Sequence, residues 1–210
     1  MTSANIWNLL RAERTLAFIS FIHSFKFLPM KSTGHIELIC GPMFSGKTTA
    51  LIERVAAARV AGRSAAVFKP ALDTRYGAGH VVSHDQRRID ATSIRDAAEL
   101  LTCDGGVQVV AIDELHFFEQ PIVAACRTLA GRGHRLIVAG VELDHRGQPF
   151  ESVAGVAAVA DVLTRLVARC ARCGAAARHS QRLIASSDRI VVGGVGEYEP
   201  RCDQCFEPSP

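Results

Sequence analysis

The sequence predicts an α/β fold built on a mainly parallel sheet, with a small C-terminal module after it. Short apolar runs that alternate with helical stretches predict the sheet and its helices. A glycine-rich loop separates the first apolar run from the first helical stretch, and two Cys-x-x-Cys pairs lie near the C-terminus. We therefore expect an N-terminal extension over 1–34, a main domain over 35–165 and the small module over 166–210.

Length, composition and charge narrow the class of protein. A chain of 210 residues with 48% hydrophobic and 21% charged residues is typical of a globular protein with a buried core. The net charge of +3 gives no electrostatic case for nucleic acid or a membrane as a partner. Four of the seven cysteines lie in Cys-x-x-Cys pairs, which favours metal ligation in a reducing cytoplasm over a disulfide framework.

The first thirty residues differ from those that follow. Residues 16–28 are strongly apolar and contain four of the ten Phe residues, but the run is too short to span a bilayer. It has the character of a signal-peptide core, yet no small-residue cleavage site follows it. We expect the segment to lie outside the main fold, with Met30 as a candidate for the true first residue. An interfacial amphipathic helix is the alternative.

The glycine-rich loop has the sequence Gly41-Pro42-Met43-Phe44-Ser45-Gly46-Lys47-Thr48. A strand is predicted before it over 35–40 and a helix after it over 49–61, the order of a phosphate-binding loop. Backbone N–H groups of such a loop converge on phosphate oxygens at the positive end of the helix. Lys47 would add a charge at the β- and γ-phosphates of ATP, and Thr48 a hydroxyl for Mg²⁺. This pattern predicts a P-loop NTPase-like (RecA-like) fold; a chance glycine-rich turn is the alternative.

The rest of the main domain alternates strands with helices. From their apolar runs, we expect strands over 64–69, 81–82, 107–112, 135–139 and 162–168. We expect helices over 93–101, 120–130 and 153–160, the first capped by Ser93 and the second with Pro121 in its first turn. Pro, Asp and Gly predict a loop over 70–77, and polar residues predict another over 140–150.

An acidic pair, Asp113 and Glu114, ends the apolar strand predicted over 107–112. In folds of this class, the glycine-rich loop and this strand end lie at the same carboxyl edge of the sheet. Asp113 can hold Mg²⁺ directly or through water, and Glu114 can accept a proton from an attacking hydroxyl or water. The alternative is that the pair only caps a strand beside a turn. The loop upstream favours the catalytic interpretation.

The two Cys-x-x-Cys pairs are Cys170 with Cys173 and Cys202 with Cys205, and 28 residues separate them. Each pair can place two thiolates on one ion, and four thiolates suit tetrahedral Zn²⁺. The ion would have a structural role, because the segment is too small to form its own core. Between the pairs we expect a β-hairpin with strands over 181–184 and 189–192. Redox-active or unrelated thiols are the alternative.

Taken in order, these motifs resemble the zinc-containing (type II) thymidine kinase family. The resemblance covers about residues 35–206 and rests on the two cysteine pairs and on Gly-Pro-Met-Phe-Ser-Gly-Lys-Thr-Thr (41–49), Lys-Pro-Ala-x-Asp-Thr-Arg-Tyr (69–76), Ser-His-Asp (83–85), Ile-Asp-Glu-x-x-Phe-Phe (112–118), Arg-Gly-x-Pro-Phe (146–150) and Val-Val-Gly-Gly-x-x-x-Tyr (191–198). The set is more specific than the loop alone, because many ATPases share the loop and the acidic strand end.

The resemblance implies transfer of the γ-phosphoryl group of ATP to the 5′-hydroxyl of thymidine or deoxyuridine, in pyrimidine deoxynucleotide salvage for DNA synthesis. It implies that Glu114 is the catalytic base. The positions that match ATP and Mg²⁺ handling are 41–48, Asp73, Thr74, Arg75, Asp113 and His116. The positions that match the nucleoside pocket are Met43, Phe117, His145, Phe150, Arg189, Ile190, Val191, Val192, Gly193 and Tyr198. A zinc-anchored lasso would hold the base through the backbone of residues 189–193, and Gly193-Gly194 would let the main chain approach it.

The resemblance also implies a cytoplasmic homotetramer that thymidine triphosphate inhibits. The chain departs from the family pattern at three places. His116 stands where the family often has Gln, His145 where it usually has Phe, and Val141-Glu142 where it tends to have Leu-Asp. These departures bear on the choice between thymidine and another pyrimidine nucleoside and leave the phosphate-binding motifs intact.

Two other interpretations fit part of the pattern. A P-loop ATPase with a nucleic-acid-binding zinc module would need a basic surface interleaved with aromatic residues. The module has a modest basic cluster, but the aromatics near it are few. A non-catalytic zinc-stabilised scaffold would not need the intact set of Lys47, Thr48, Asp113 and Glu114.

Overall fold

The computed structural model describes residues 34–75, 77, 79–83, 85–103 and 106–208. These residues all belong to the second of two units into which the chain divides, residues 33–210. The predictions for the N-terminal extension and for Met30 lie outside the described residues, apart from Gly34. Within the described ranges, no helix has the length and apolar character that crossing a bilayer requires.

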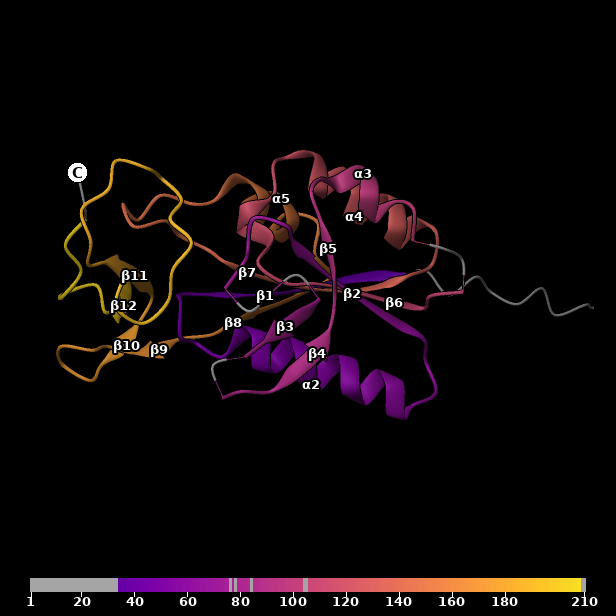
Figure 1. The fold of residues 1–210 in the computed structure, drawn as a ribbon, viewed down its shortest axis with the longest axis horizontal. Coiled ribbons are helices and arrows are strands. Elements are labelled where there is room, and N and C mark those ends of the chain that lie inside the picture. Colours follow the sequence, from indigo (N-terminus) through magenta and orange to yellow (C-terminus); the bar gives the residue numbers. More distant parts are fainter. Residues whose placement is uncertain (1–33, 76, 78, 84, 104–105, 209–210) are drawn as a thin grey trace, which may run out of the picture. The chain divides into compact units, whose positions relative to one another are not determined.

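A sheet of six parallel strands forms the centre of the described unit (Figure 1), as the apolar runs predicted. The strand order is β5-β2-β6-β7-β1-β8, and the bounds are β1 (His35–Gly41), β2 (Ala65–Pro70), β5 (Thr92–Ile94), β6 (Val109–Ile112), β7 (Arg135–Val141) and β8 (Val162–Arg165). β1 lies between β7 and β8, so the strand that leads into the glycine-rich loop is internal.

Helices cover both faces of this sheet (Figure 1). Helix α2 (Lys47–Val60) packs on one face, and α3 (Ala97–Leu100), α4 (Pro121–Gly131) and α5 (Glu151–Ala157) lie on the other. Neighbouring strand residues point to opposite faces, so Leu38 of β1 joins the core under α4 and α5 while Ile39 joins Leu51 and Val55 of α2. The unbroken apolar runs therefore contribute side chains to two hydrophobic cores, one on each face of the sheet.

The helix predicted over 93–101 is wrong in its first half. Residues Thr92–Ile94 form β5, which pairs with β2 from Phe68↔Thr92 to Pro70↔Ile94. The helix cap is Asp96 in place of Ser93, because its Oδ1 accepts from the backbone N–H groups of Ala98 (2.8 Å) and Glu99 (3.1 Å). Sheet pairing at the edge of β2 outweighs the helical spacing of a short apolar stretch.

Other predicted elements are present with shifted bounds. Helix α2 begins at Lys47, α5 begins at Glu151, and β6 begins at Val109. The short strand predicted over 81–82 is β3 (His80–Val82), which forms a hairpin with an unpredicted strand, β4 (Arg88–Asp90). The strand predicted over 162–168 divides into β8 and β9 (Ala168–Arg169), which belong to different sheets.

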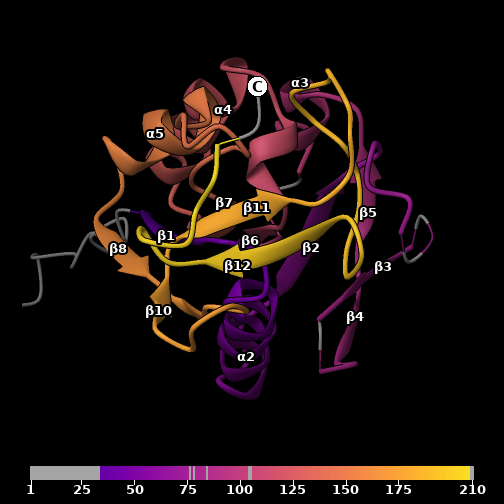
Figure 2. The same cartoon turned by 90° about the vertical axis from the view of Figure 1, so that its left-hand side faces the viewer.

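The C-terminal module contains two small antiparallel pairs. β9 pairs with β10 (Ala176–Ala177), and β11 (His179–Arg182) lies beside β12 (Tyr198–Arg201), as Figure 2 shows. The predicted hairpin is therefore wrong in its second strand: residues 189–192 form no strand and belong to a long loop between β11 and β12. The side chain of Arg182 binds the carbonyls of Asp188 and Arg189, and this replaces strand pairing in that loop.

Candidate active site

Two glycines with positive φ shape the loop between β1 and α2. Gly41 has φ 145°, and a Cβ there would lie 2.4 Å from the carbonyl oxygen of Leu166. Gly46 has φ 84° and precedes Lys47, the first residue of α2. Residues with a Cβ rarely adopt either conformation. The backbone of the loop therefore requires glycine at both positions, independently of any ligand.

Lys47 is buried inside this loop. Its Nζ donates to the carbonyl oxygen of Pro42 at 2.6 Å, and Oγ of Ser45 donates to the same oxygen at 2.8 Å. Burial lowers the pKa of Lys47, and the negative charges of Glu114 and Asp113 oppose that shift. A phosphate group at the loop would supply the anionic partner that this buried amine favours.

Thr48 and Asp113 meet at the carboxyl edge of the sheet. Asp113 follows β6 directly and is 4% exposed, and Oγ1 of Thr48 donates to its Oδ2 at 3.0 Å. Burial, and then the charge of Glu114, raise the pKa of Asp113 to about 7. Hydroxyl and carboxylate oxygens are the ligands that Mg²⁺ takes at phosphoryl-transfer sites, so this pair fits the ion that accompanies ATP.

Glu114 adopts a left-handed backbone conformation with φ 52°, which is uncommon for a residue with a Cβ. Its carboxylate pairs with the guanidinium of Arg75, and Nε of Arg75 donates to Oδ1 of Asp73 at 2.7 Å. Burial alone would raise the pKa of Glu114, but the positive charge of Arg75, and then those of protonated His116 and of Lys47, outweigh burial and lower the pKa to about 2. Glu114 is therefore ionised at neutral pH.

These groups line a cavity of about 390 Å³. The residues predicted from the sequence that the structure brings together around it are Met43, Phe44, Gly46, Lys47, Thr48, Asp73, Arg75, Asp113, Glu114, His116, Phe117, His145, Phe150, Arg189, Ile190, Val191, Gly193 and Tyr198. They come from the glycine-rich loop, from the loops after β2, β6 and β7, and from the C-terminal module. Phosphate-binding and apolar groups therefore share one cavity.

We use the name lasso for residues 183–197, the loop that connects β11 to β12. The buried guanidinium of Arg182 donates to the carbonyl oxygens of Asp188 (2.5 Å) and Arg189 (3.0 Å) and to the hydroxyl of Tyr198 (3.0 Å). That hydroxyl donates to the carbonyl oxygen of Val191 at 3.1 Å. Arg182 and Tyr198 thus fix the path of the lasso from the side of the module.

Arg189 attaches the lasso to the loop after β7. Its Nε donates to Oδ2 of Asp144 at 2.8 Å, its NH1 group to the carboxylate of Glu151 at 3.0 Å and its NH2 group to the carbonyl oxygen of Pro149 at 2.9 Å. The guanidinium also lies over the ring of Phe150, 5.1 Å from its centroid. These contacts use Nε and both terminal nitrogens of the guanidinium, so the side chain serves mainly to hold the lasso against the loop after β7.

Gly193 has a close neighbour within the lasso itself. A Cβ at this position would lie 2.8 Å from Cβ and Cγ of Glu197, whose Oε2 accepts from the backbone N–H of Gly194 at 2.8 Å. The carbonyl oxygen of Gly193 accepts from NH1 of Arg75 at 3.3 Å. Packing against Glu197 therefore favours glycine at position 193, in addition to the predicted approach of the main chain to a base.

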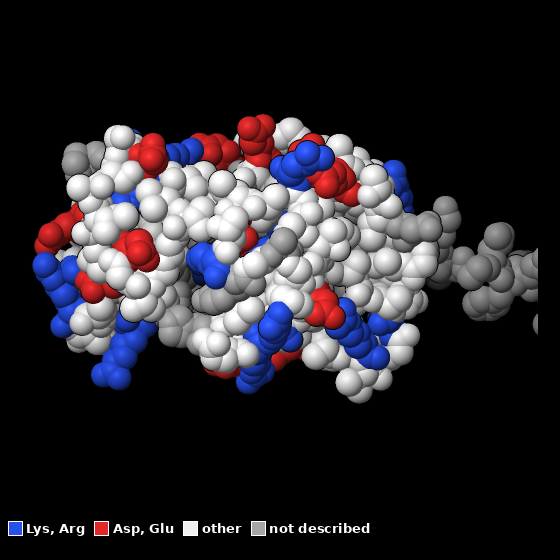
Figure 3. All heavy atoms as spheres, viewed as in Figure 1, with Lys and Arg blue, Asp and Glu red and all other residues white. Residues whose placement is uncertain are grey.

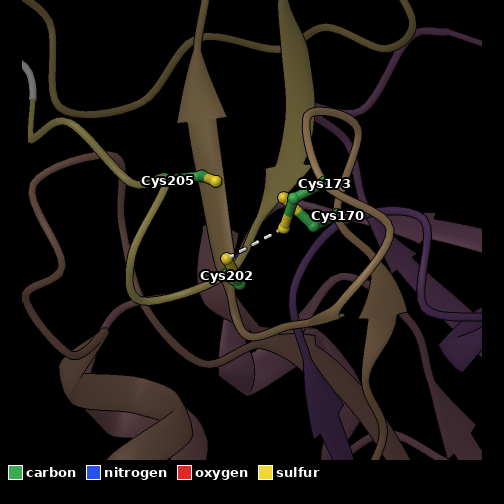
Figure 4. A group of neighbouring side chains, drawn as sticks. All are labelled: Cys170, Cys173, Cys202 and Cys205. Carbon is green, nitrogen blue, oxygen red and sulfur yellow. Dashed lines mark hydrogen bonds between the residues drawn. The ribbon is translucent and has the colours of Figure 1, made fainter.

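The four predicted cysteine ligands gather in the C-terminal module (Figure 4). Their Sγ atoms all lie within 4.8 Å of one another, and those of Cys173 and Cys202 are 3.5 Å apart. Among the described residues, this is the group of His, Cys, Asp and Glu side chains that offers a metal site of this kind. Four thiols at this spacing suit one tetrahedral Zn²⁺ ion.

Charges are mixed on the face of the molecule drawn in Figure 3. Acidic side chains are interspersed among the basic ones, and the described residues form no continuous basic stripe on this face. Non-specific nucleic-acid binding depends on clustered positive charge, so this face gives no support to the interpretation as a nucleic-acid-binding ATPase.

Comparison with known proteins identifies the family. The family model for thymidine kinase matches residues 34–206. The chain belongs to the thymidine kinase family. It is 46% identical to the thymidine kinase of Rhodothermus sp. (strain ITI 518) over 177 residues, which cover 84% of this chain and 83% of that protein. It is 47% identical to the thymidine kinase of Roseiflexus castenholzii over 192 residues, which cover 86% of this chain and 98% of that protein.

Some predicted site residues of this thymidine kinase family member do not line the cavity. They are Gly41, Pro42, Ser45, Thr74 and Val192. Gly41, Pro42 and Ser45 instead shape the glycine-rich loop through its backbone and through the carbonyl that Lys47 and Ser45 share. A residue can belong to a binding motif through its conformation alone, without a side chain that faces the ligand.

Sequence reasoning also missed several lining residues, namely Thr49, Val81, Val82, Gln86, Val141, Leu143, Asp144, Ser180 and Val195. Ser180 is the clearest case, because its Oγ accepts from the backbone N–H of Met43 at 3.0 Å across 137 residues. A contact between residues so far apart in the sequence leaves no pattern in the residues around either of them. Val81 and Val82 had a strand signal, but nothing in their chemistry pointed to a site.

Proposed function

We propose that this chain is an ATP-dependent thymidine kinase that phosphorylates thymidine or deoxyuridine, within pyrimidine deoxynucleotide salvage for DNA synthesis. The observation that carries the proposal is the ionised carboxylate of Glu114 beside Arg75 in a cavity that also contains the glycine-rich loop. A base, a cation for phosphate and a site for a triphosphate are the groups that phosphoryl transfer to an alcohol needs. Membership of the thymidine kinase family supports thymidine as the acceptor.

The phosphate groups of ATP are assigned to the loop over 41–48. Its backbone N–H groups and Lys47 would bind the β- and γ-phosphates, and Thr48 and Asp113 would hold Mg²⁺. Bound Mg²⁺ would neutralise charge that develops on the phosphates. Arg75 would turn from Glu114 toward the transferring group, because a phosphate anion competes with the carboxylate for the guanidinium.

Glu114 acts as the base in the proposed step. Its carboxylate accepts the proton of the 5′-hydroxyl while the 5′-oxygen forms a bond to the γ-phosphorus. The bond from that phosphorus to the β–γ bridging oxygen breaks, and ADP leaves with its electron pair. Arg75, Lys47 and the loop N–H groups stabilise the charge on the phosphoryl oxygens.

The nucleoside is assigned to the part of the cavity lined by Phe117, Phe150, Tyr198 and the lasso. Aromatic rings provide apolar surface for a pyrimidine, and main-chain groups of residues 189–193 provide hydrogen bonds to its edge. Closure of the lasso would exclude water, which would otherwise compete with the 5′-hydroxyl for the γ-phosphoryl group. Zn²⁺ on the four cysteines would have a structural role, because it fixes the module that carries the lasso.

The proposal includes the wider organisation of the protein. It assigns residues 35–165 to the kinase domain and 166–210 to the zinc and lasso module, with the segment over 1–34 outside the catalytic fold. It further assigns a homotetramer in the cytoplasm and inhibition by the end product, thymidine triphosphate. Light scattering on the full chain would measure the oligomeric state, and inhibition kinetics would measure the effect of thymidine triphosphate.

The decisive experiment compares the wild type with Glu114→Gln on a panel of nucleosides with ATP. We expect thymidine monophosphate from the wild type and a loss of about 100-fold or more in kcat for the variant. Glu119→Gln is the matched control, because Glu119 is exposed and does not line the cavity. Hydrolysis of ATP without a nucleoside product would contradict the kinase proposal, and its stimulation by nucleic acid would favour the ATPase alternative.

A further inference from the structure

His116 occupies a position between the proposed base and the aromatic wall of the cavity. It lies in the short 3-10 helix Leu115–Phe117, which follows Glu114 directly. Its ring centroid is 4.2 Å from that of Phe117 and 5.1 Å from that of Phe150, and its side chain is only 9% exposed. The imidazole is therefore held by two neighbouring rings and lines the cavity.

A backbone group fixes the tautomer of this imidazole. The N–H of Val141 donates to Nδ1 of His116 at 3.3 Å, so Nδ1 is an acceptor and carries no hydrogen. The carboxylate of Glu114 could accept a hydrogen bond from a protonated Nδ1. It lies 3.6 Å from that atom, which is too far for a hydrogen bond. Burial lowers the pKa of His116 to about 4, so the ring is neutral and its proton is on Nε2.

The resulting Nε2–H group has no protein partner. Within the part of the chain that the structure describes, His116 makes no hydrogen bond other than that from Val141, and its Nε2 is not enclosed by the protein. A donor that faces a cavity is hydrogen-bonded to water there, and a ligand that displaces the water must accept from it or lose that hydrogen bond. The structure thus presents one fixed, uncharged donor to whatever occupies the cavity.

We infer that His116 donates a hydrogen bond from Nε2 to a sugar oxygen of the bound nucleoside. The inference rests on the proposed function, because the 5′-hydroxyl must lie within hydrogen-bond reach of Glu114 for proton transfer. Nδ1 of the imidazole lies 3.6 Å from that carboxylate. With the 5′-hydroxyl at Glu114, the sugar oxygens would be the acceptors nearest to Nε2. His116 is then a substrate-positioning residue that holds the sugar against the base, and this role differs from the one in ATP and Mg²⁺ handling that the family resemblance implies for the position.

The same geometry explains which side chains can take this position. A neutral imidazole with its proton on Nε2 presents an acceptor to Val141 and a donor to the cavity. The side-chain amide of Gln has the same two functions, with its oxygen as acceptor and its NH₂ group as donor. Phe has a similar ring and neither function. His116→Gln should therefore retain the contact, and His116→Phe should lose it.

The test measures kcat and KM of the wild type, His116→Gln and His116→Phe with thymidine and with 3′-deoxythymidine. We expect His116→Phe to lower kcat/KM for thymidine roughly tenfold or more and His116→Gln to stay within about threefold of the wild type. If 3′-deoxythymidine abolishes the difference between wild type and His116→Phe, the acceptor is the 3′-hydroxyl. If the difference persists, the acceptor is an oxygen on the 5′ side; either result supports the contact.

Controls separate this contact from effects on folding. His35→Gln changes a partly exposed histidine at the start of β1, away from the cavity, and should leave the kinetics unchanged. Unfolding midpoints of all variants show whether they are folded, and ¹⁵N NMR of the histidines reports whether Nε2 is protonated and shifts when thymidine binds. Equal kcat/KM for His116→Phe and wild type, or equal losses in both variants, would overturn the inference.

Failure of the proposed function would look different. A wild type that forms no product from any nucleoside contradicts the kinase proposal, whatever the variants do. The contact can then be tested without an activity measurement. Thymidine should raise the unfolding midpoint of a protein that binds it, and this shift is compared between the wild type and His116→Phe. An equal shift in the two proteins would overturn it, and a smaller shift in His116→Phe would support it.

Discussion

The guanidinium of Arg75 pairs with the carboxylate of Glu114 across 39 residues of sequence. The same guanidinium donates to Oδ1 of Asp73 at 2.7 Å and to the carbonyl oxygen of Gly193 at 3.3 Å. One side chain therefore connects the loop after β2, the end of β6 and the lasso. In the proposed reaction, it also determines how basic Glu114 is before substrates bind.

Arg75→Ala should change both the rate and its pH dependence. Loss of the guanidinium removes a charge that lowers the pKa of Glu114, so that pKa rises. The base must be ionised, and activity falls as the pH drops through its pKa; the acid limb of kcat/KM should therefore move to higher pH. We expect kcat to fall about 1,000-fold, as for other arginines at phosphoryl-transfer sites.

Arg63→Ala is the control for this experiment, because Arg63 is exposed and does not line the cavity. A pH–rate profile of Arg75→Ala whose acid limb coincides with that of the wild type would show that Arg75 does not control the ionisation of Glu114.

Arg182→Met should loosen the lasso. The variant leaves the carbonyls of Asp188 and Arg189 and the hydroxyl of Tyr198 without their donor. We expect the free energy of unfolding to fall by about 2–4 kcal/mol and KM for thymidine to rise more than KM for ATP. Urea unfolding and steady-state kinetics measure the two effects.

Arg182→Lys should rescue little of this loss, because an ammonium group lacks the planar set of donors that reaches several acceptors at once. Arg178→Met offers a matched control in the same module, at an exposed position. If the lysine variant behaves like the wild type, a positive charge suffices and the hydrogen-bond account is wrong.

Removal of zinc should unfold the C-terminal module and weaken nucleoside binding. Cys173→Ser takes away one of the four thiols whose Sγ atoms lie within 4.8 Å of one another. We expect less than one zinc per chain by elemental analysis and an unfolding midpoint lower by about 5–10 °C. Cys103→Ser, outside the cluster, should keep its zinc; a full complement of zinc in Cys173→Ser would contradict the assignment.

His145→Phe should stabilise the protein in the absence of ligand. His145 is 2% exposed, and neither ring nitrogen has a hydrogen-bond partner in the described part of the chain. Burial, and then the nearby charge of Arg182, lower the pKa of His145, so the cost is that of a neutral polar ring. We expect a gain of about 1 kcal/mol, measured as a higher urea midpoint with an unchanged slope.

His134→Phe is the matched control for this prediction. His134 is also buried, but its Nδ1 is 2.7 Å from the carbonyl oxygen of Val107, a hydrogen bond that Phe cannot make. The same substitution should therefore destabilise the protein at position 134. Destabilisation at both positions would show that His145 packs better than Phe or has a bound water as a partner.

Local patterns predicted the parts of the fold that local physics determines. Gly46 and Lys47 lie where a glycine must adopt positive φ and a helix must begin, so the motif and the structure coincide. The apolar run before Asp113 specifies a strand buried on both faces, and that strand is β6. The cysteine pairs determine their own geometry, because two thiols three residues apart can reach one ion.

The parts that failed depend on distant partners. Thr92–Ile94 forms a strand because β2 offers an open edge, which the apolar spacing of the segment does not reveal. The lasso has its shape because the guanidinium of Arg182 replaces strand pairing, and Ser180 reaches the cavity through its contact with Met43. Each of these depends on where a partner lies in space, which the residue types around it do not encode.

The position of β1 inside the sheet has a consequence for synthesis of the chain. Its partners come from late in the sequence, with His35 opposite Arg135 of β7 and Glu37 opposite Val162 of β8. A growing polypeptide therefore makes its nucleotide-binding strand first and completes both neighbours only after most of the chain has been translated. Until then, an apolar strand has two unpaired edges, which favours aggregation. Capacity to bind ATP should appear abruptly and late on the ribosome, and prematurely terminated chains should be substrates for chaperones.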